Sequence, residues 1–101
     1  MENPKYKATV YLYQRRSRQD TWGRMDPPAG LDYRPTAVWS TCCACDKCAR
    51  HHSLRVLFQE KPEFGKLLRA EVQFLVPEAT PTPVFHLMEG DRITGQVVME
   101  D

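Results

Sequence analysis

Hydrophobic and polar residues alternate along several short segments of the chain. In segment 6–12, every second residue from Tyr6 to Leu12 is hydrophobic, so these side chains share one face of an extended strand. Segment 68–74 alternates even more regularly. The strand pattern occurs in the segments 6–12, 36–40, 54–58, 68–74, 84–88 and 95–99. The same alternation points His86 away from its two hydrophobic neighbours, and we expect this side chain to face outward.

The connections between these strands contain residues that favour turns. Residues 26–30 read Asp-Pro-Pro-Ala-Gly, which excludes both a helix and a central strand. Residues 89–92, Glu-Gly-Asp-Arg, are short enough for a hairpin connection. Many short strands joined by such turns are typical of a barrel or a sandwich, and not of a fold in which strands and helices alternate. The sequence therefore predicts an all-β fold.

The length and composition indicate one globular domain over residues 1–101. Of its 101 residues, 42% are hydrophobic and 27% are charged, which is enough apolar surface to form a core. The net charge is +1, but the first half of the chain is basic and the second half acidic. We therefore expect a polar molecule with one cationic patch.

The chain is expected to stay clear of membranes. No segment approaches the roughly 20 consecutive apolar residues that a membrane-spanning helix needs. Residues 1–5 do not lead into the apolar stretch of a signal peptide. We therefore predict a cytoplasmic location.

Four motifs occur in an order that is known from one family. They are the strand 7–12, Tyr33-Arg34-Pro35 after a long loop, a glycine-started strand over 65–77 that ends in proline, and the hairpin 89–98. In this order they resemble the C-terminal β-barrel domain (domain III) of the translation elongation factor Tu family. Asp91 stands where that family has a glycine in its closing hairpin.

The resemblance implies a six-stranded antiparallel β-barrel. In the family, this barrel packs on the other domains and contacts aminoacyl-tRNA and the exchange factor, whereas the chemistry lies in a separate GTPase domain. The chain has no Gly-x-x-x-x-Gly-Lys-Ser/Thr loop to hold phosphates, so we do not expect it to bind GTP. Transfer-RNA binding does not follow from the resemblance, because an isolated barrel supplies only part of that surface.

The strongest cationic stretch follows the first predicted strand. It contains an aromatic side chain among the basic residues Arg15, Arg16, Arg18, Trp22 and Arg24. Arginines can hold phosphates and a tryptophan can stack on a base, so this stretch is a candidate RNA-binding or partner-binding site. The alternative is a solvated hairpin loop whose Trp22 caps the barrel mouth.

Two further arginines lie within the motifs that resemble the family. Arg34 and Arg92 are each adjacent to predicted turns. An arginine in such a position most often pairs with a nearby carboxylate or carbonyl group. The resemblance alone makes both of them candidates for a surface that contacts a partner.

A cluster of cysteines is the second candidate site. All four cysteines of the chain lie between Cys42 and Cys48, and two histidines follow. A Cys-x-x-Cys spacing lets two thiolates hold one tetrahedral zinc ion, and the candidate ligands are Cys42, Cys45, Cys48 and His51. A redox switch and ordinary loop or strand cysteines are the alternatives. The second Cys-x-x-Cys arm of a zinc ribbon is absent.

The sequence contains no supported set of catalytic residues, and we expect that the protein is not an enzyme. The leading hypothesis is a stand-alone binding module that contacts a protein, as an immunity-type or adaptor protein does, or contacts RNA. The alternative hypothesis is a small zinc-binding or redox protein that uses the cysteine cluster. The sequence predicts neither the identity of the partner nor the oligomeric state.

Overall fold

The computed structural model describes residues 4–38, 51–75 and 83–100. These residues form seven strands and no helix. The strands are β1 (Lys5–Leu12), β2 (Asp32–Tyr33), β3 (Thr36–Val38), β4 (His51–Phe58), β5 (Leu68–Phe74), β6 (Val84–Glu89) and β7 (Arg92–Met99). The all-β prediction is therefore confirmed. A search of the described residues for a helix able to cross a membrane found none.

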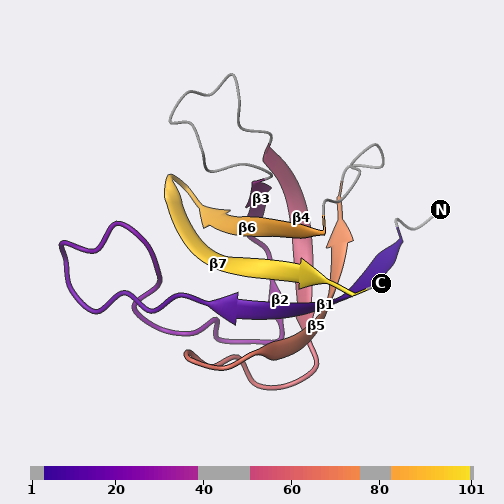
Figure 1. The fold of residues 1–101 in the computed structure, drawn as a ribbon, viewed down its shortest axis with the longest axis horizontal. Coiled ribbons are helices and arrows are strands. Elements are labelled where there is room, and N and C mark those ends of the chain that lie inside the picture. The colour runs from indigo at the N-terminus through magenta and orange to yellow at the C-terminus, as the bar shows by residue number, and fades with distance from the viewer. Residues whose placement is uncertain (1–3, 39–50, 76–82, 101) are drawn as a thin grey trace.

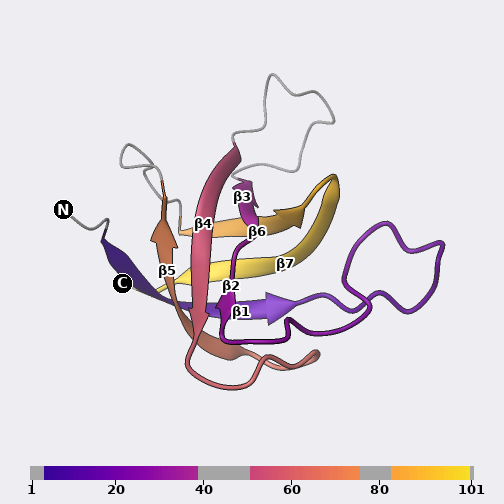
Figure 2. The same cartoon turned by 180° about the vertical axis from the view of Figure 1, so that it is seen from behind.

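Six of the seven strands close into an antiparallel barrel (Figures 1 and 2). The neighbours follow the order β4-β3-β6-β7-β1-β5, and the pairing of β5 with β4 closes the ring. This arrangement confirms the predicted six-stranded antiparallel barrel. β2 is an additional strand, which pairs with β4 next to Leu57, farther along β4 than the stretch that pairs with β3.

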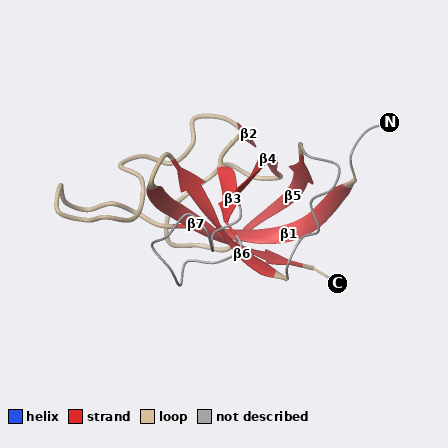
Figure 3. Ribbon diagram, turned by 90° about the horizontal axis from the view of Figure 1, so that it is seen from above, coloured by secondary structure: helices blue, strands red, loops and turns tan. Residues whose placement is uncertain are grey.

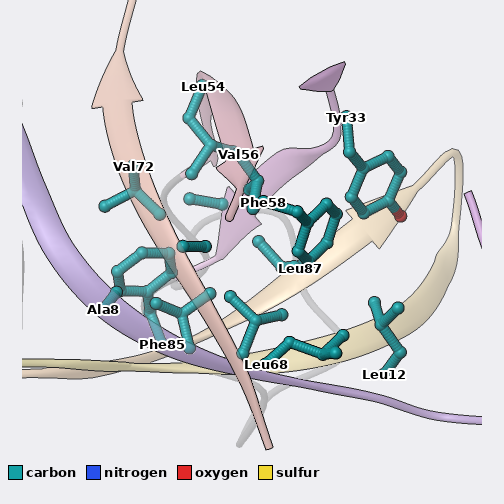
Figure 4. Packing of buried hydrophobic residues seen from close by; sticks show 14 of the residues in the cluster. Ala8, Leu12, Tyr33, Leu54, Val56, Phe58, Leu68, Val72, Phe85 and Leu87 are labelled. Carbon is teal, nitrogen blue, oxygen red and sulfur yellow. The ribbon is translucent and has the colours of Figure 1, made fainter. Parts of the chain in front are cut away.

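The core lies inside the ring and follows from the period of two in the sequence. In β1, Ala8, Val10 and Leu12 are buried, as the alternation predicted. The partner strands contribute their own alternate residues, and Figure 4 shows these side chains pointing toward one another inside the barrel. The buried cluster includes Tyr33, Leu54, Val56, Phe58, Leu68, Val72, Phe85 and Leu87.

A bend in β7 shapes one end of the barrel. A side chain at Gly95 would place its Cβ 2.8 Å from the carbonyl oxygen of Tyr11, so only glycine allows β7 to approach β1 this closely. The pairing of β6 with β7 is irregular between Leu87 and Met88, which leaves Thr94 as an extra residue on β7. Thr94 is fully buried at this position, and its hydroxyl group points toward Tyr33.

Two strands are longer than the hydrophobic pattern predicted. β4 begins at His51 and not at Leu54, because its first three residues pair with β3. β7 begins at Arg92 and not at Gly95. These added residues are mostly polar, and pairing through the backbone leaves no hydrophobic signal in the sequence.

A long connection between β1 and β2 extends beyond the end of the barrel (Figures 1 and 3). It contains the predicted cationic stretch. The candidate site is built on the base of this connection and on the strands beside it.

Candidate functional site

The segment from residue 14 to residue 24, which we call the arginine loop, is fixed at its base by backbone hydrogen bonds. The amide of Tyr13 donates to the carbonyl of Thr94 at 2.9 Å, and the amide of Gly23 donates to the carbonyl of Ile93 at 2.7 Å. Gly23 has a φ of +97°, and a Cβ there would lie 2.7 Å from the Arg15 nitrogen. Glycine is therefore required for the two sides of the loop to approach each other at its base.

The tip of the loop is held by its own side chains. The carboxylate of Asp20 accepts the amide hydrogens of Arg16 at 2.7 Å and Ser17 at 3.0 Å. These backbone hydrogen bonds, from Arg16 first, lower the pKa of Asp20. The guanidinium of Arg15 donates to the carbonyl oxygens of Ser17 and Arg18. Arg15 therefore stabilises the loop conformation and has less capacity to bind a partner.

Arg16 and Arg18 present their side chains to solvent. Both residues are exposed, and neither guanidinium interacts with another part of the chain that the structure describes. An unpaired guanidinium keeps all five of its donors for an external anion. These two residues are the arginines of the loop that are free to bind a partner.

Arg24 has a structural role at the base of the loop. It forms an ion pair with Glu89 and donates to the carbonyl of Asp26 at 2.9 Å. Its guanidinium also lies 5.3 Å from the centre of the Tyr33 ring. Arg24 therefore closes the end of the barrel, although the sequence grouped it with the binding residues.

The hydroxyl group of Tyr33 joins this structural network. It donates to the carboxylate of Glu89 and lies 2.8 Å from the hydroxyl oxygen of Thr94. Burial raises the pKa of Tyr33, and its hydrogen bond to Glu89 raises the pKa further, so the phenol stays protonated. A hollow of about 400 Å³ lies beside the ion pair of Arg24 and Glu89, and Arg15, Arg92 and Asp26 also contribute charge to its lining.

The two arginines of the family-like motifs are also paired. Arg92 donates to the carbonyl of Asp20 at 3.3 Å and so ties the loop to β7. Arg34 lies 3.4 Å from the carboxylate of Asp32, which also binds Arg55 at 2.9 Å. The hydrogen bond from Arg55, with a smaller contribution from Arg34, lowers the pKa of Asp32. Arg34 directly follows β2, and its ion pair with Asp32 lies on the β2 and β4 side of the barrel.

An aromatic cluster lies against the base of the loop, on the outside of the barrel. The Tyr13 ring stacks on Trp22, with 5.7 Å between ring centroids and 26° between ring planes. His86 lies 6.1 Å from Trp22 and 6.5 Å from Tyr13. Tyr11 meets Tyr13 edge to face at 5.9 Å. We call these four side chains the aromatic face; Trp22 remains 46% exposed and Tyr11 38% exposed.

Burial affects the titration of two members of the aromatic face. It raises the pKa of Tyr13, and the neighbouring Tyr11 adds to that increase. It lowers the pKa of His86 below 6.5. Both shifts favour the uncharged forms of Tyr13 and His86. The prediction that His86 faces outward is confirmed, although packing against two rings leaves it only partly exposed.

Beside the aromatic face, the outward side chains of β1, β7 and β6 form two uncharged rows, and the basic Arg69 of β5 lies opposite Thr9 at their edge. One row across β1, β7 and β6 contains Tyr11, Gln96 and His86, and the next contains Thr9, Val98 and Val84. Both valines are more than 40% exposed, at 46% for Val98 and 43% for Val84. The outward residues of β4 and β5, in contrast, include Arg55, Arg69 and Glu71. Uncharged surface of this kind is therefore concentrated on one side of the barrel.

The sequence identified Trp22 and the arginines, but it missed Tyr11, Tyr13 and His86 as parts of one site. Alternation placed Tyr11 and His86 outside the barrel without showing that they are neighbours. They become neighbours because β7 pairs with β1 on one side and with β6 on the other. Trp22 does not cap the barrel mouth, since its ring packs on the outward side chains Tyr13 and His86.

The predicted metal ligands cannot be placed from the structure. Cys42, Cys45 and Cys48 lie outside the described residues, as does the side chain of His51. Within the described ranges 4–38, 51–75 and 83–100, no group of three His, Cys, Asp or Glu side chains could hold a metal ion. The zinc site therefore remains a prediction from the sequence.

Comparisons with protein-family models and with curated proteins found no match to this chain. The barrel agrees with the fold that the resemblance to elongation factor Tu domain III implies. Barrels of this kind serve many functions, however, so the shared architecture does not identify the family. The function must be argued from the surface itself.

Proposed function

We propose that the protein is a non-catalytic module that binds single-stranded RNA through the aromatic face and the arginine loop. The observation that carries this proposal is the position of Arg16 and Arg18, whose guanidinium groups have no partner among the described residues, in the loop whose Trp22 stacks on Tyr13. Single-stranded nucleic acids are bound by such a combination, since bases stack on aromatic rings and arginines hold the phosphates.

The uncharged sheet beside the loop supports the same proposal. The rows that contain Gln96 and Val98 present no carboxylate that would repel a phosphate. Asp20, the acidic residue of the loop, accepts two backbone amide hydrogens, which partly offset its charge. Trp, Tyr and Arg are also enriched in protein interfaces, so a protein partner is the competing interpretation. The two partners differ in how strongly their binding depends on salt.

A role without catalysis is supported by the way the ionisable groups are used. Glu89 is one of the two carboxylates that line the hollow beside Arg24, the other being Asp26, and it is engaged by Arg24 and Tyr33. An RNA partner also fits the cytoplasmic location that the sequence predicts. A role close to translation is a further prediction, which rests on the resemblance alone.

Fluorescence anisotropy with a labelled oligouridylate 12-mer tests the proposal. The wild type is compared with the double variant R16A/R18A and with R34A/R55A, which removes the same charge from the β2 and β4 side of the barrel. Affinity should fall steeply with salt for the wild type. The slope of log affinity against log salt should be smaller by about 1.4 for R16A/R18A, because each lost phosphate contact on a single strand removes about 0.7.

Two results would contradict the proposal. One is a wild-type protein that shows no binding to the oligonucleotide at low salt. The other is equal affinity and equal salt slope for the two double variants, because the binding would then reflect net charge and not the loop. Circular dichroism of all three proteins checks that the barrel is intact.

A further inference from the structure

A second hollow lies between the end of β1 and the connection from β4 to β5. Its volume is about 290 Å³, and it is lined chiefly by Tyr11, Tyr13, Gln14, Arg16, Phe64 and Gly65. Tyr11 and Tyr13 also belong to the aromatic face, and Arg16 belongs to the arginine loop. The hollow is therefore continuous with the surface proposed to bind RNA.

The side chains that line this second hollow suit a planar ligand that carries a negative charge. Tyr11, Tyr13 and Phe64 supply aromatic rings, Gln14 supplies an amide, and no carboxylate lines the hollow. Arg16 supplies a guanidinium that is unpaired among the described residues. Planar aromatic ligands stack on such rings, and an anionic group beside them pairs with the guanidinium. The volume is at the lower limit of ligand pockets, which suits one small planar group.

We propose that this hollow holds a single unstacked base of the bound RNA, while Arg16 holds the adjoining phosphate. This inference rests on the proposed function, because it assigns one nucleotide of the same strand to a defined position. The bases that follow would stack on Trp22. The hollow therefore fixes which nucleotide of the RNA lies at which position on the protein. Stacking on Trp22 alone does not fix this position.

Gly65 offers a test with a matched control. Its φ is +76°, and a Cβ added there would meet nothing within 4 Å. Asn and Asp tolerate a positive φ better than other side chains, and they have nearly the same shape. G65N and G65D therefore differ by one negative charge at the rim of the hollow, close to the phosphate that Arg16 is proposed to hold.

The two variants should bind the labelled oligouridylate differently. G65N should stay within about threefold of the wild type, since asparagine adopts a positive φ more readily than most side chains and adds no charge. G65D should bind at least about tenfold more weakly at low salt, because a carboxylate beside a phosphate is repulsive. Equal affinities of G65N and G65D would overturn the inference.

Nuclear magnetic resonance separates the failure of this inference from failure of the proposed function. The ¹⁵N-labelled protein is titrated with hexauridylate, with an abasic phosphodiester of the same length, and with an acidic peptide. We expect hexauridylate to shift both the Gly65 amide and the Trp22 indole signals, and the abasic chain, which offers Arg16 a phosphate without a base, to shift Gly65 less.

Each other outcome has a definite meaning. Shifts at Trp22 without shifts at Gly65 overturn the base pocket and leave RNA binding intact. A Gly65 shift from the abasic chain equal to that from hexauridylate shows a phosphate site without a base, which also overturns the pocket. No shift from either nucleic-acid chain, or a stronger response to the acidic peptide, overturns the proposed function and the pocket together.

Discussion

The indole of Trp22 stacks on the ring of Tyr13, with 5.7 Å between their centroids and 26° between their planes. Tyr13 directly follows β1 and is tied to β7 by its amide hydrogen bond to the carbonyl of Thr94. The stack therefore places an exposed ring of the arginine loop against the rigid barrel. A ring held in this way loses little conformational freedom when a base stacks on it.

Replacing Trp22 by alanine should weaken RNA binding without unfolding the barrel. The loss of one stacked base corresponds to about 1–3 kcal/mol of binding free energy. W22F keeps an aromatic ring and should retain most of the affinity. The measurement is anisotropy with the oligouridylate 12-mer, together with urea unfolding of each variant. Wild-type affinity in W22A, with an unchanged unfolding midpoint, would exclude the ring from the binding surface.

Substitutions at Tyr33 and Thr94 should lower the stability of the barrel and leave RNA binding unchanged. Y33F removes the hydroxyl that Glu89 and the buried Thr94 share, and should lower the free energy of unfolding by about 1–2 kcal/mol. In Y33F the Thr94 hydroxyl keeps only its 3.4 Å hydrogen bond to the Leu87 carbonyl, so the double variant Y33F/T94V should be only slightly less stable than Y33F. Urea unfolding measures this coupling. If either variant lost RNA affinity while remaining folded, the hydrogen-bond network around Tyr33 would take part in RNA binding. Our assignment of binding to the aromatic face and the arginine loop would then be wrong.

The fold was largely predictable because its core obeys one simple period. The alternation from Tyr6 to Leu12, and that of segment 68–74, corresponds to most of the residues that β1 and β5 bury, although Tyr6 is only partly buried and β5 also buries the polar Gln73. β2 was missed because two residues cannot display a period, and Tyr33 was noticed only within the Tyr-Arg-Pro motif. The polar start of β4 was missed for a related reason, since its backbone pairing with β3 leaves no hydrophobic signal.

The candidate site was predictable only in part, because a surface depends on which strands become neighbours. The cluster of arginines near Trp22 was visible in the sequence, whereas the row from Tyr11 to His86 requires the pairing of β7 with both β1 and β6. The sequence also could not separate free arginines from paired ones. Arg24 is paired through Glu89, which lies 65 positions later in the chain, and no local pattern reports such a contact.

The cysteine cluster allows a separate prediction about metal content. If Cys42, Cys45, Cys48 and His51 bind zinc, protein purified without chelator should contain close to one zinc ion per chain by elemental analysis. C45S/C48S should lose the metal, and acidification of the wild type should release it, because thiolate and imidazole ligands must be deprotonated. A content below about 0.1 zinc per chain in the wild type would contradict the zinc interpretation.

His86 should make the stability of the barrel depend on pH. Burial against Tyr13 and Trp22 lowers its pKa below 6.5, and the groups opposite it on the neighbouring strands, Gln96 and Val38, are uncharged. The unfolded chain therefore binds a proton near pH 6.5, whereas the folded chain binds it only at lower pH. Between the pKa of His86 in the folded state and its pKa in the unfolded state, the unfolded chain holds more protons than the folded chain. The free energy of unfolding therefore decreases as the pH falls through this range.

The variant H86Q isolates this effect, because glutamine does not titrate and the other two histidines of the chain remain in both proteins. Urea unfolding at several pH values from 7.5 to 5 should show that the wild type loses more stability than H86Q as the pH is lowered. Above pH 7 the histidine is neutral in both states, and the two curves should run parallel. A wild-type curve that is parallel to that of H86Q over the whole range would show that His86 protonates as easily in the folded barrel as in the unfolded chain, and the packing of its ring against Trp22 and Tyr13 would then be wrong.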